Sequence, residues 1–196
     1  RLHDQRGARR GLEQARVEFA EGVQPIIGAL LAVARPVDIG PAGAIDWLVL
    51  LAQDEAGYAA LCRLVSAAHL DRPLSEEPHV PFDALADSAG LICLTAGREG
   101  AVARLFAEVR GEAAKSYVAR LEQFFPDRLY VELSRRGDEV EEAAEAALID
   151  LAYARGLPLV ATNPAQYAEP SFHAAHDAML CIAQSAYVDS TERAVS

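Results

Sequence analysis

Histidine and carboxylate side chains occur close together at two places in the chain. His173, His176 and Asp177 lie near the end, and His3 and Asp4 are adjacent near the start. Imidazole and carboxylate groups bind transition metals and transfer protons. His173 and His176 are three residues apart, so they share one face of a helix. Neither group has a third partner nearby in sequence, so a surface or capping role competes with a metal site at both places.

An apolar segment that ends in polar residues precedes the later group. Residues 157–161, Leu-Pro-Leu-Val-Ala, follow Gly156, and a short apolar run of this kind is typical of a buried parallel strand. Ligands bind at the carboxyl ends of such strands in α/β proteins. Here these ends offer Asn163, Pro164 and Gln166, and none of them is a good metal ligand or general base at neutral pH. The sequence therefore predicts an active-site rim that has lost its chemistry.

Short apolar strands alternate with amphipathic helices along the whole chain. The patterns predict strands over residues 23–33, 45–52, 91–94, 128–133 and 157–161. They predict helices over residues 8–21, 54–69, 82–87, 100–109, 112–124, 138–154 and 172–186, with residues 71–81 as a loop. Alternation of this kind indicates a parallel α/β sheet or barrel. The connections at 35–43 and 71–81 are too short to separate domains.

Composition and charge exclude several classes of protein. The 196 residues are 52% hydrophobic, which indicates one globular domain rather than a disordered chain. The net charge of -11 argues against a nucleic-acid groove within these residues. The sequence has no signal peptide and no apolar run of transmembrane length, so we expect a cytoplasmic protein with no membrane partner.

The cysteines and the two ends of the chain carry further expectations. Cys62, Cys93 and Cys181 have no CxxC spacing and lie in apolar contexts, which predicts buried thiols in a reducing compartment. The chain opens on Arg1 rather than Met, and residues 1–4 read like the tail of a strand. Residues 189–196 are polar and show no helix or strand pattern. We therefore expect a piece of a larger protein.

Two charged clusters have simple structural explanations. Glu13, Glu18 and Glu21 interleave with an arginine cluster at positions 6, 9, 10 and 16, so a solvated helix face is favoured over a phosphate site there. The acidic residues at 138–145 open a helix, where the helix dipole favours negative charge. The sequence contains no Gly-rich phosphate loop, nucleophile elbow or HExxH motif. These patterns alone indicate an α/β domain without a defined reaction.

Seven stretches, taken in order, resemble a known family. They read PIIG at 25–28, LVLLAQDEAGY at 48–58, LCRLVS at 61–66, GLICLT at 90–95, RLYVEL at 128–133, GLPLVATN at 156–163 and AHDAMLCI at 175–182. Together they resemble the polymerase-and-histidinol-phosphatase (PHP) domain of bacterial DNA polymerase III alpha subunits. The resemblance implies a distorted (β/α)7 TIM-like barrel that fills residues 1–196 and is incomplete at the N-terminus. The first strand would precede this chain, and the polymerase domains would follow Ser196.

The resemblance also implies where a metal site would be. Metal-binding members of the family hold two or three metals that activate water for phosphoester hydrolysis. The family's ligand positions fall on residues that bind such metals poorly or not at all, namely Gln5, Leu30, Trp47, Gly97, Pro164 and Gln166. His3, Asp4, His173, His176 and Asp177 remain as residual polar candidates. We therefore expect a degenerate metal site, no bound cofactor and no catalytic residue in this chain.

The function implied by the resemblance is a non-catalytic one within a replicative DNA polymerase. The domain would stabilise the polymerase, contact its remaining domains and dock the proofreading exonuclease subunit. DNA would be bound through the parent protein, whose own active site would use magnesium for nucleotidyl transfer. One alternative is a metal-dependent phosphoesterase or 3'-5' exonuclease whose rearranged site uses His3, Asp4, His173 and His176. Another is the PHP domain of an error-prone polymerase paralogue.

Overall fold

A computed structural model of the chain describes residues 20–22, 24–41, 43–73, 75–163 and 168–190. The chain divides into two compact units, Arg1–Ala161 and Thr162–Ser196, and each unit is considered by itself. Within the described residues, no helix has both the length and the apolar character that crossing a membrane requires.

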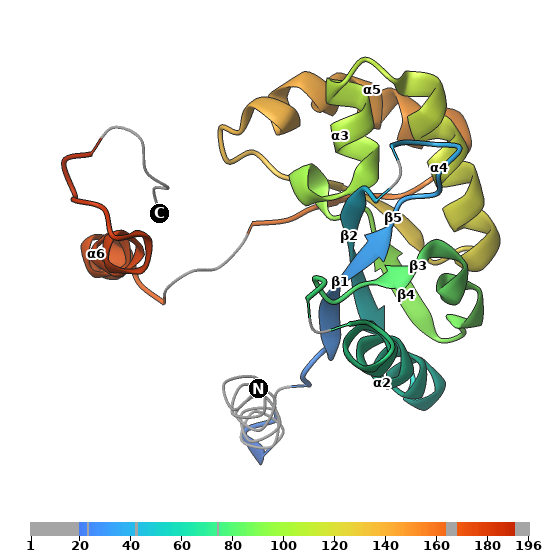
Figure 1. Ribbon diagram of the computed structural model, residues 1–196, viewed down its shortest axis with the longest axis horizontal. Coiled ribbons are helices and arrows are strands. Elements are labelled where there is room, and N and C mark those ends of the chain that lie inside the picture. The colour runs from blue at the N-terminus through green and yellow to red at the C-terminus, as the bar shows by residue number, and fades with distance from the viewer. Residues whose placement is uncertain (1–19, 23, 42, 74, 164–167, 191–196) are drawn as a thin grey trace. The chain divides into compact units, whose positions relative to one another are not determined.

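The first unit is built on a six-stranded mixed sheet (Figure 1). Its strands are β1 (Gly28–Ala34), β2 (Ile45–Ala52), β3 (Val80–Pro81), β4 (Leu91–Leu94), β5 (Leu129–Leu133) and β6 (Leu159–Ala161), in the spatial order β3-β1-β2-β4-β5-β6. β2 runs antiparallel to both of its neighbours, whereas β1–β3, β4–β5 and β5–β6 are parallel. The described sheet is open, with β3 and β6 at its edges.

The prediction of a parallel sheet is therefore wrong at β2. Residues 35–44 join β1 to β2, and those of them that the structure describes contain turns but no helix. A parallel crossover needs a dozen or more residues, so a connection this short produces an antiparallel hairpin. A second difference is β3, whose two residues, Val80 and Pro81, both lie in the segment predicted to be a loop. It pairs with the end of β1 over residues 33–34.

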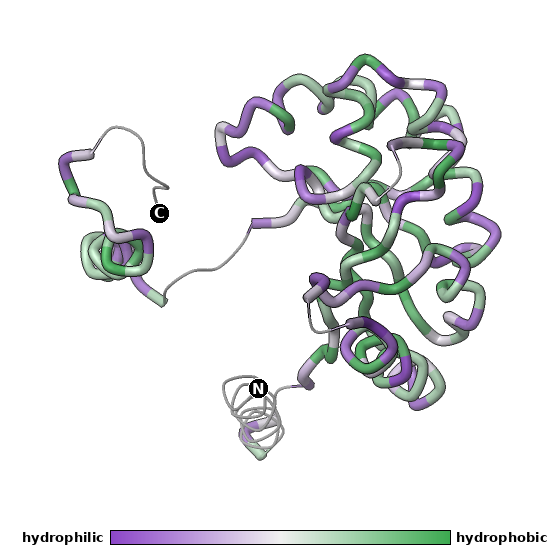
Figure 2. Tube along the Cα trace, in the orientation of Figure 1, coloured by the Kyte–Doolittle hydropathy of each residue, from purple (hydrophilic) through white to green (hydrophobic). Residues whose placement is uncertain are grey.

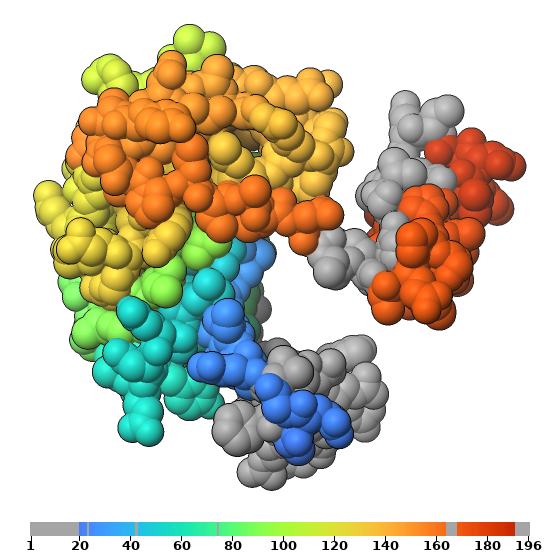
Figure 3. Space-filling view, turned by 180° about the vertical axis from the view of Figure 1, so that it is seen from behind, coloured from blue at the N-terminus to red at the C-terminus, as the bar shows by residue number. Residues whose placement is uncertain are grey.

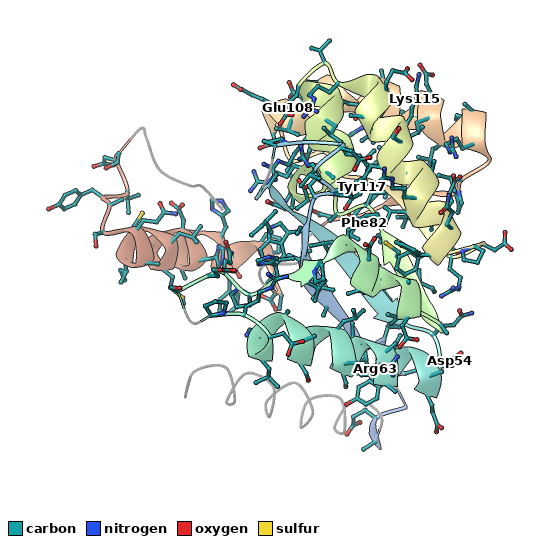
Figure 4. All side chains as sticks on the ribbon, turned by 45° about the vertical axis from the view of Figure 1, so that its right-hand side comes forward. Asp54, Arg63, Phe82, Glu108, Lys115 and Tyr117 are labelled. Carbon is teal, nitrogen blue, oxygen red and sulfur yellow. The ribbon has the colours of Figure 1, made fainter. Side chains whose placement is uncertain are left out.

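Helices cover one face of the sheet. They are α2 (Glu55–Leu70), η1 (Phe82–Asp87), η2 (Gly97–Glu99), α3 (Ala101–Ala107), α4 (Gly111–Phe124) and α5 (Glu139–Arg155). The core contains the alternate strand residues that face this layer, Leu31, Val33, Leu48, Leu50, Leu91, Cys93, Leu129 and Val131. The hydropathy colouring shows the strands as the most continuous apolar segments (Figure 2). Aromatic rings join the helices, since Phe82 lies 5.1 Å from Tyr117 between ring centroids (Figure 4).

The predicted helix ends agree closely with the structure. Asp54 caps α2, where its Oδ1 accepts a hydrogen bond of 2.8 Å from the Gly57 amide. Asp138 caps α5 in the same way by accepting from the amides of Val140 and Glu141. Gly156 ends α5 in the left-handed conformation, with φ of 66°, which glycine adopts without a steric penalty.

Burial differs from the sequence prediction at two places. Cys93 and Cys181 are buried as predicted, but Cys62 is exposed on α2. β6 was predicted to be buried, yet Leu159 is 37% exposed, because β6 is an edge strand of the described sheet. An edge strand has a neighbour on one side only, so an apolar run in the sequence does not by itself determine burial.

The second unit contains η3 (Pro170–Phe172) and α6 (His173–Gln184). α6 ends at Ser185, which adopts the left-handed conformation with φ of 53°. Asp177 and Cys181, one helical turn apart, are buried, whereas Met179 and Ile182 are exposed.

Candidate functional site on the open face of the sheet

Two of the predicted metal-ligand positions, Leu30 and Trp47, belong to the sheet face opposite the helices. We call this face the open face and define it by Leu30, Ala32, Trp47, Val49, Ile92, Leu94, Tyr130, Glu132 and Val160, which alternate with the core residues along the strands. The pairing register places Leu30 opposite Val49 and Ala32 opposite Trp47. Glu132 is the one charged residue of this set, and it lies opposite Val160.

The structure brings Leu30 and Trp47 together on this face. They lie on adjacent strands and are offset by two positions in the register, so they are diagonal neighbours. Leu30 is 52% exposed, and Trp47 is half-buried. The third position, Gly97, follows β4 and opens η2 with φ of 47°. A Cβ atom at Gly97 would lie 3.3 Å from Ser134 Oγ.

The other predicted positions are not part of this group. Gln5, Pro164 and Gln166, together with His3 and Asp4, lie outside the described residues.

The histidine pair belongs to the second unit. His173 is the first residue of α6 and is exposed, His176 is half-buried, and Asp177 is only 8% exposed. The prediction that the two histidines lie on one helix is confirmed.

The three described positions where the family resemblance implies ligands, Leu30, Trp47 and Gly97, do not fit a metal. Leu30 offers only carbon atoms, Trp47 offers an indole N–H that donates, and Gly97 has no side chain. A transition metal needs several imidazole, thiolate or carboxylate ligands around one point. Within the part of the chain that the structure describes, no three His, Cys, Asp or Glu side chains come close enough together to hold an ion.

A polar network lies beside this group at the carboxyl ends of β4 and β5. The Glu132 amide donates to Thr95 Oγ1 at 2.9 Å, which ties the two strand ends together. Ser134 Oγ donates to Glu141 Oε1, and Arg136 donates to the same carboxylate through its amide, Nε and Nη2 at 3.0, 3.0 and 2.7 Å. Sequence analysis did not find this network, although the spacing of Arg136 and Glu141 at the start of a helix was a signal for the pair.

The electrostatics of this network favour a structural role. Burial alone would raise the pKa of Glu141, but hydrogen bonds from Ser134 and Arg136 outweigh it and lower the pKa. A carboxyl group that stays ionised cannot act as a general acid near neutral pH. The adjoining cavity of about 10 Å³ has the size of one water molecule and is too small for a substrate. Burial raises the pKa of the nearby Cys93 thiol, so this thiol is not a nucleophile either.

A separate hollow lies along the outer side of α2. Its volume is about 410 Å³, and it is lined by Cys62, Arg63, Ser66, Ala67, Leu70 and Asp71. All of these residues belong to α2 and its C-cap, and the hollow is shallow. Elsewhere on the first unit, α5 and α4 lie beside each other (Figure 3), and Arg155 pairs with Glu122 across them.

Comparison with known proteins identifies related chains. Residues 8–136 match the family described as PHP domain. The chain is 44% identical over 178 residues to "DNA polymerase III subunit alpha" of Caulobacter vibrioides. This match covers 88% of this chain and 15% of that protein. The proteins of the same name from Escherichia coli K12 and Rickettsia bellii are 34% and 32% identical, over 173 and 172 residues. These matches cover 88% and 87% of this chain, and the chain spans only 15% and 14% of those proteins.

Proposed function

Because this chain belongs to the PHP domain family, we propose that it is the PHP domain of a DNA polymerase III alpha subunit and that it acts in DNA replication. The observation that carries the proposal is the 44% identity to a protein of that name over 88% of the chain. The chain spans about 15% of that relative, so nucleotidyl transfer and its magnesium ions would belong to other parts of the polypeptide. Extension assays with the complete polypeptide test the proposal, and a chain without template-directed DNA synthesis would contradict it.

We further propose that the open sheet is part of a distorted (β/α)7 barrel. This proposal is supported by the apolar residues on the open face and on the edge strand β6, which the described part of the chain leaves exposed. Leu30 is 52% exposed on the open face, and the edge strand β6 carries only Leu, Val and Ala. Edge strands that remain free usually carry charges, prolines or bulges that prevent pairing. Barrel closure predicts that Leu30→Cys in the complete polypeptide resists thiol labelling, and rapid labelling would contradict closure.

The PHP domain is proposed to be non-catalytic. Leu30 and Trp47 occupy positions where the family resemblance implies metal ligands, and neither side chain coordinates a metal. We expect that the complete polypeptide, without a proofreading subunit, does not hydrolyse 3' ends or a phosphodiester substrate in manganese. The matched control is His173→Ala/His176→Ala, which removes the imidazole groups of α6. Hydrolysis that this variant abolishes would instead support a rearranged metal site.

The last part of the proposal is a docking role for the proofreading exonuclease subunit. A domain that lacks hydrolysis leaves proofreading to a separate protein, and the family resemblance implies that this protein binds here. Calorimetric titration of the complete polypeptide with the exonuclease subunit tests this role. We expect one-to-one binding that a chelator does not change and that deletion of residues 1–196 removes. Binding that survives the deletion would place the docking surface elsewhere in the polypeptide.

A further inference from the structure

A buried ion pair joins the ends of β1 and β2. Arg35 follows β1 directly, and its Nε and Nη2 atoms donate to Asp46 Oδ2 and Oδ1 on β2, both at 2.7 Å. The two side chains are 2% and 0% exposed. Replacing a buried ion pair by apolar residues of similar volume is often neutral or stabilising. Stability alone therefore does not account for two charges at this place.

The apolar pattern of the hairpin leaves its register undetermined. β1 reads GALLAVA and β2 reads IDWLVLLA, so Asp46 is the only charged residue in the two strands. A slip by two residues keeps every side chain on its face, and a slip by one exchanges apolar residues for other apolar residues at every position except Asp46. The native register places Val33 opposite Asp46 and Leu30 opposite Val49. Apart from Asp46 and its partner Arg35, the polarity of the residues does not distinguish this register from its neighbours.

Two charged residues, one on α3 and one at its C-terminal end, contact the ends of both strands. Arg104 Nη1 donates to Asp46 Oδ1 at 2.9 Å and to the carbonyl of Ile45 at 3.0 Å, so it contacts β2 twice. Glu108, one turn further along, lies 4.0 Å from Arg35 Nη1 at the end of β1. Glu108 lies at the end of the helical layer in Figure 4.

We propose that the Arg35–Asp46 pair, positioned against Arg104 and Glu108, fixes the pairing register of β1 and β2. A slip of two residues displaces one strand by about 7 Å relative to the other. The bidentate geometry between Arg35 and Asp46 does not survive such a displacement. A slipped hairpin therefore leaves charges in the core without their hydrogen bonds, which is strongly unfavourable. The Arg35–Asp46 ion pair thus destabilises the slipped registers of β1 and β2 more than it stabilises the native register.

Disulfide trapping on the open face reports the register directly. The Arg35 amide donates to the Ala44 carbonyl, and the Ala52 amide donates to the Ile27 carbonyl. These bonds make Leu30 and Val49 a non-hydrogen-bonded pair, with Cα atoms about 4.5 Å apart, within the range of a disulfide.

Cysteines at Leu30 and Val49 test the native register. Cysteines at Leu30 and Leu51, or at Leu30 and Trp47, test the two slipped registers. All three pairs are compared in the complete polypeptide and in a background with Arg35→Met/Asp46→Leu, and linked peptides are identified by mass spectrometry. The unchanged background should form only the 30–49 link. The apolar background should also form a slipped link.

Formation of the 30–49 link alone, at unchanged yield in the apolar background, would overturn the proposal. A milder variant decides the matter if the double replacement does not fold. Arg104 is 39% exposed, so Arg104→Met removes the contacts to β2 without leaving a cavity in the deep core. A slipped link should then appear at lower yield, and its absence in this variant would refute the proposal as well.

Discussion

Two glycines in the first turns of helices should respond to alanine in opposite ways. A Cβ atom at Gly57 in α2 would lie 1.9 Å from the carbonyl oxygen of Gly90, which is too close for any real contact. The capping bond from the Gly57 amide to Asp54 holds this backbone in place. A Cβ atom at Gly111 in α4 would lie 3.5 Å from Phe106 Cε1, an ordinary van der Waals distance. The pair isolates the effect of the close backbone contact.

The expected free-energy changes follow from two opposing effects. Alanine is favoured over glycine in a helix by up to about 1 kcal/mol. Forcing extra atoms into a packed region costs about 3 kcal/mol when the neighbour is backbone, since backbone cannot rotate away. Gly57→Ala should therefore destabilise α2 by about 2 kcal/mol, after the gain in helix propensity is included. Gly111→Ala should stabilise α4 by up to about 1 kcal/mol.

Hydrogen exchange measures both effects in the complete polypeptide. A loss of about 2 kcal/mol corresponds to roughly 30-fold faster exchange of the amides of α2 and of the start of β4. The amides of α4 should exchange at the same rate or more slowly in Gly111→Ala. Slower exchange of α2 in Gly57→Ala, or changes of the same sign in both variants, would refute the assigned contact between α2 and Gly90.

Three further predictions concern buried or capping groups. The Tyr117 hydroxyl is buried and has no hydrogen-bond partner among the described residues. Tyr117→Phe should therefore leave the free energy of unfolding, measured by urea denaturation, unchanged or raise it by up to about 1 kcal/mol. A clear loss of stability would contradict this. Iodoacetamide should label Cys62, which is exposed, but not Cys93, which is buried and has a raised pKa; equal labelling of the native protein would be the contrary result. Burial alone would raise the pKa of Asp138, but hydrogen bonds from Arg98 and two backbone amides lower it. The ionised Asp138 carboxylate therefore stabilises the fold above the ordinary aspartate pKa, and this stabilisation is lost as pH falls through the lowered pKa. Asp138→Asn should reduce stability at neutral pH and progressively less in acid. A reduction that does not depend on pH would show that the charge is not involved.

Local patterns in the sequence were sufficient for most of the secondary structure. The predicted strand over 45–52 coincides with β2, and the helix starts predicted at Asp54 and Asp138 are confirmed. These features depend on residues within a few positions of one another, such as a carboxylate next to free amides at a helix start. Gly156 after an amphipathic run marks the end of α5 for the same reason.

Interactions between distant residues could not be predicted in this way. β3 has only two residues, so it is too short to have a periodic pattern. The bond from the Glu132 amide to Thr95 joins residues 37 apart, and Arg104 reaches Asp46 across 58 residues. No local rule relates such positions. The exposure of Cys62 was missed because its apolar neighbours in sequence lie on the other side of α2.

The candidate site was predicted through the family resemblance and not through its own chemistry. The apolar pattern places Leu30 and Trp47 on strands, but a leucine and a tryptophan carry no signal of a metal site. The structure adds that the two residues share one face of the sheet. It also shows that the neighbouring polar groups, Ser134, Arg136 and Glu141, are engaged with one another.

The metal content of the complete polypeptide tests the central claim most directly. The protein is dialysed against zinc or manganese, freed of loosely held ions, and analysed by elemental mass spectrometry beside His173→Ala/His176→Ala. The proposed degenerate PHP domain predicts less than one zinc or manganese ion per chain, with no difference between the two proteins. Two or three tightly held ions per chain, lost from the variant, would contradict the claim and establish a rearranged metal site.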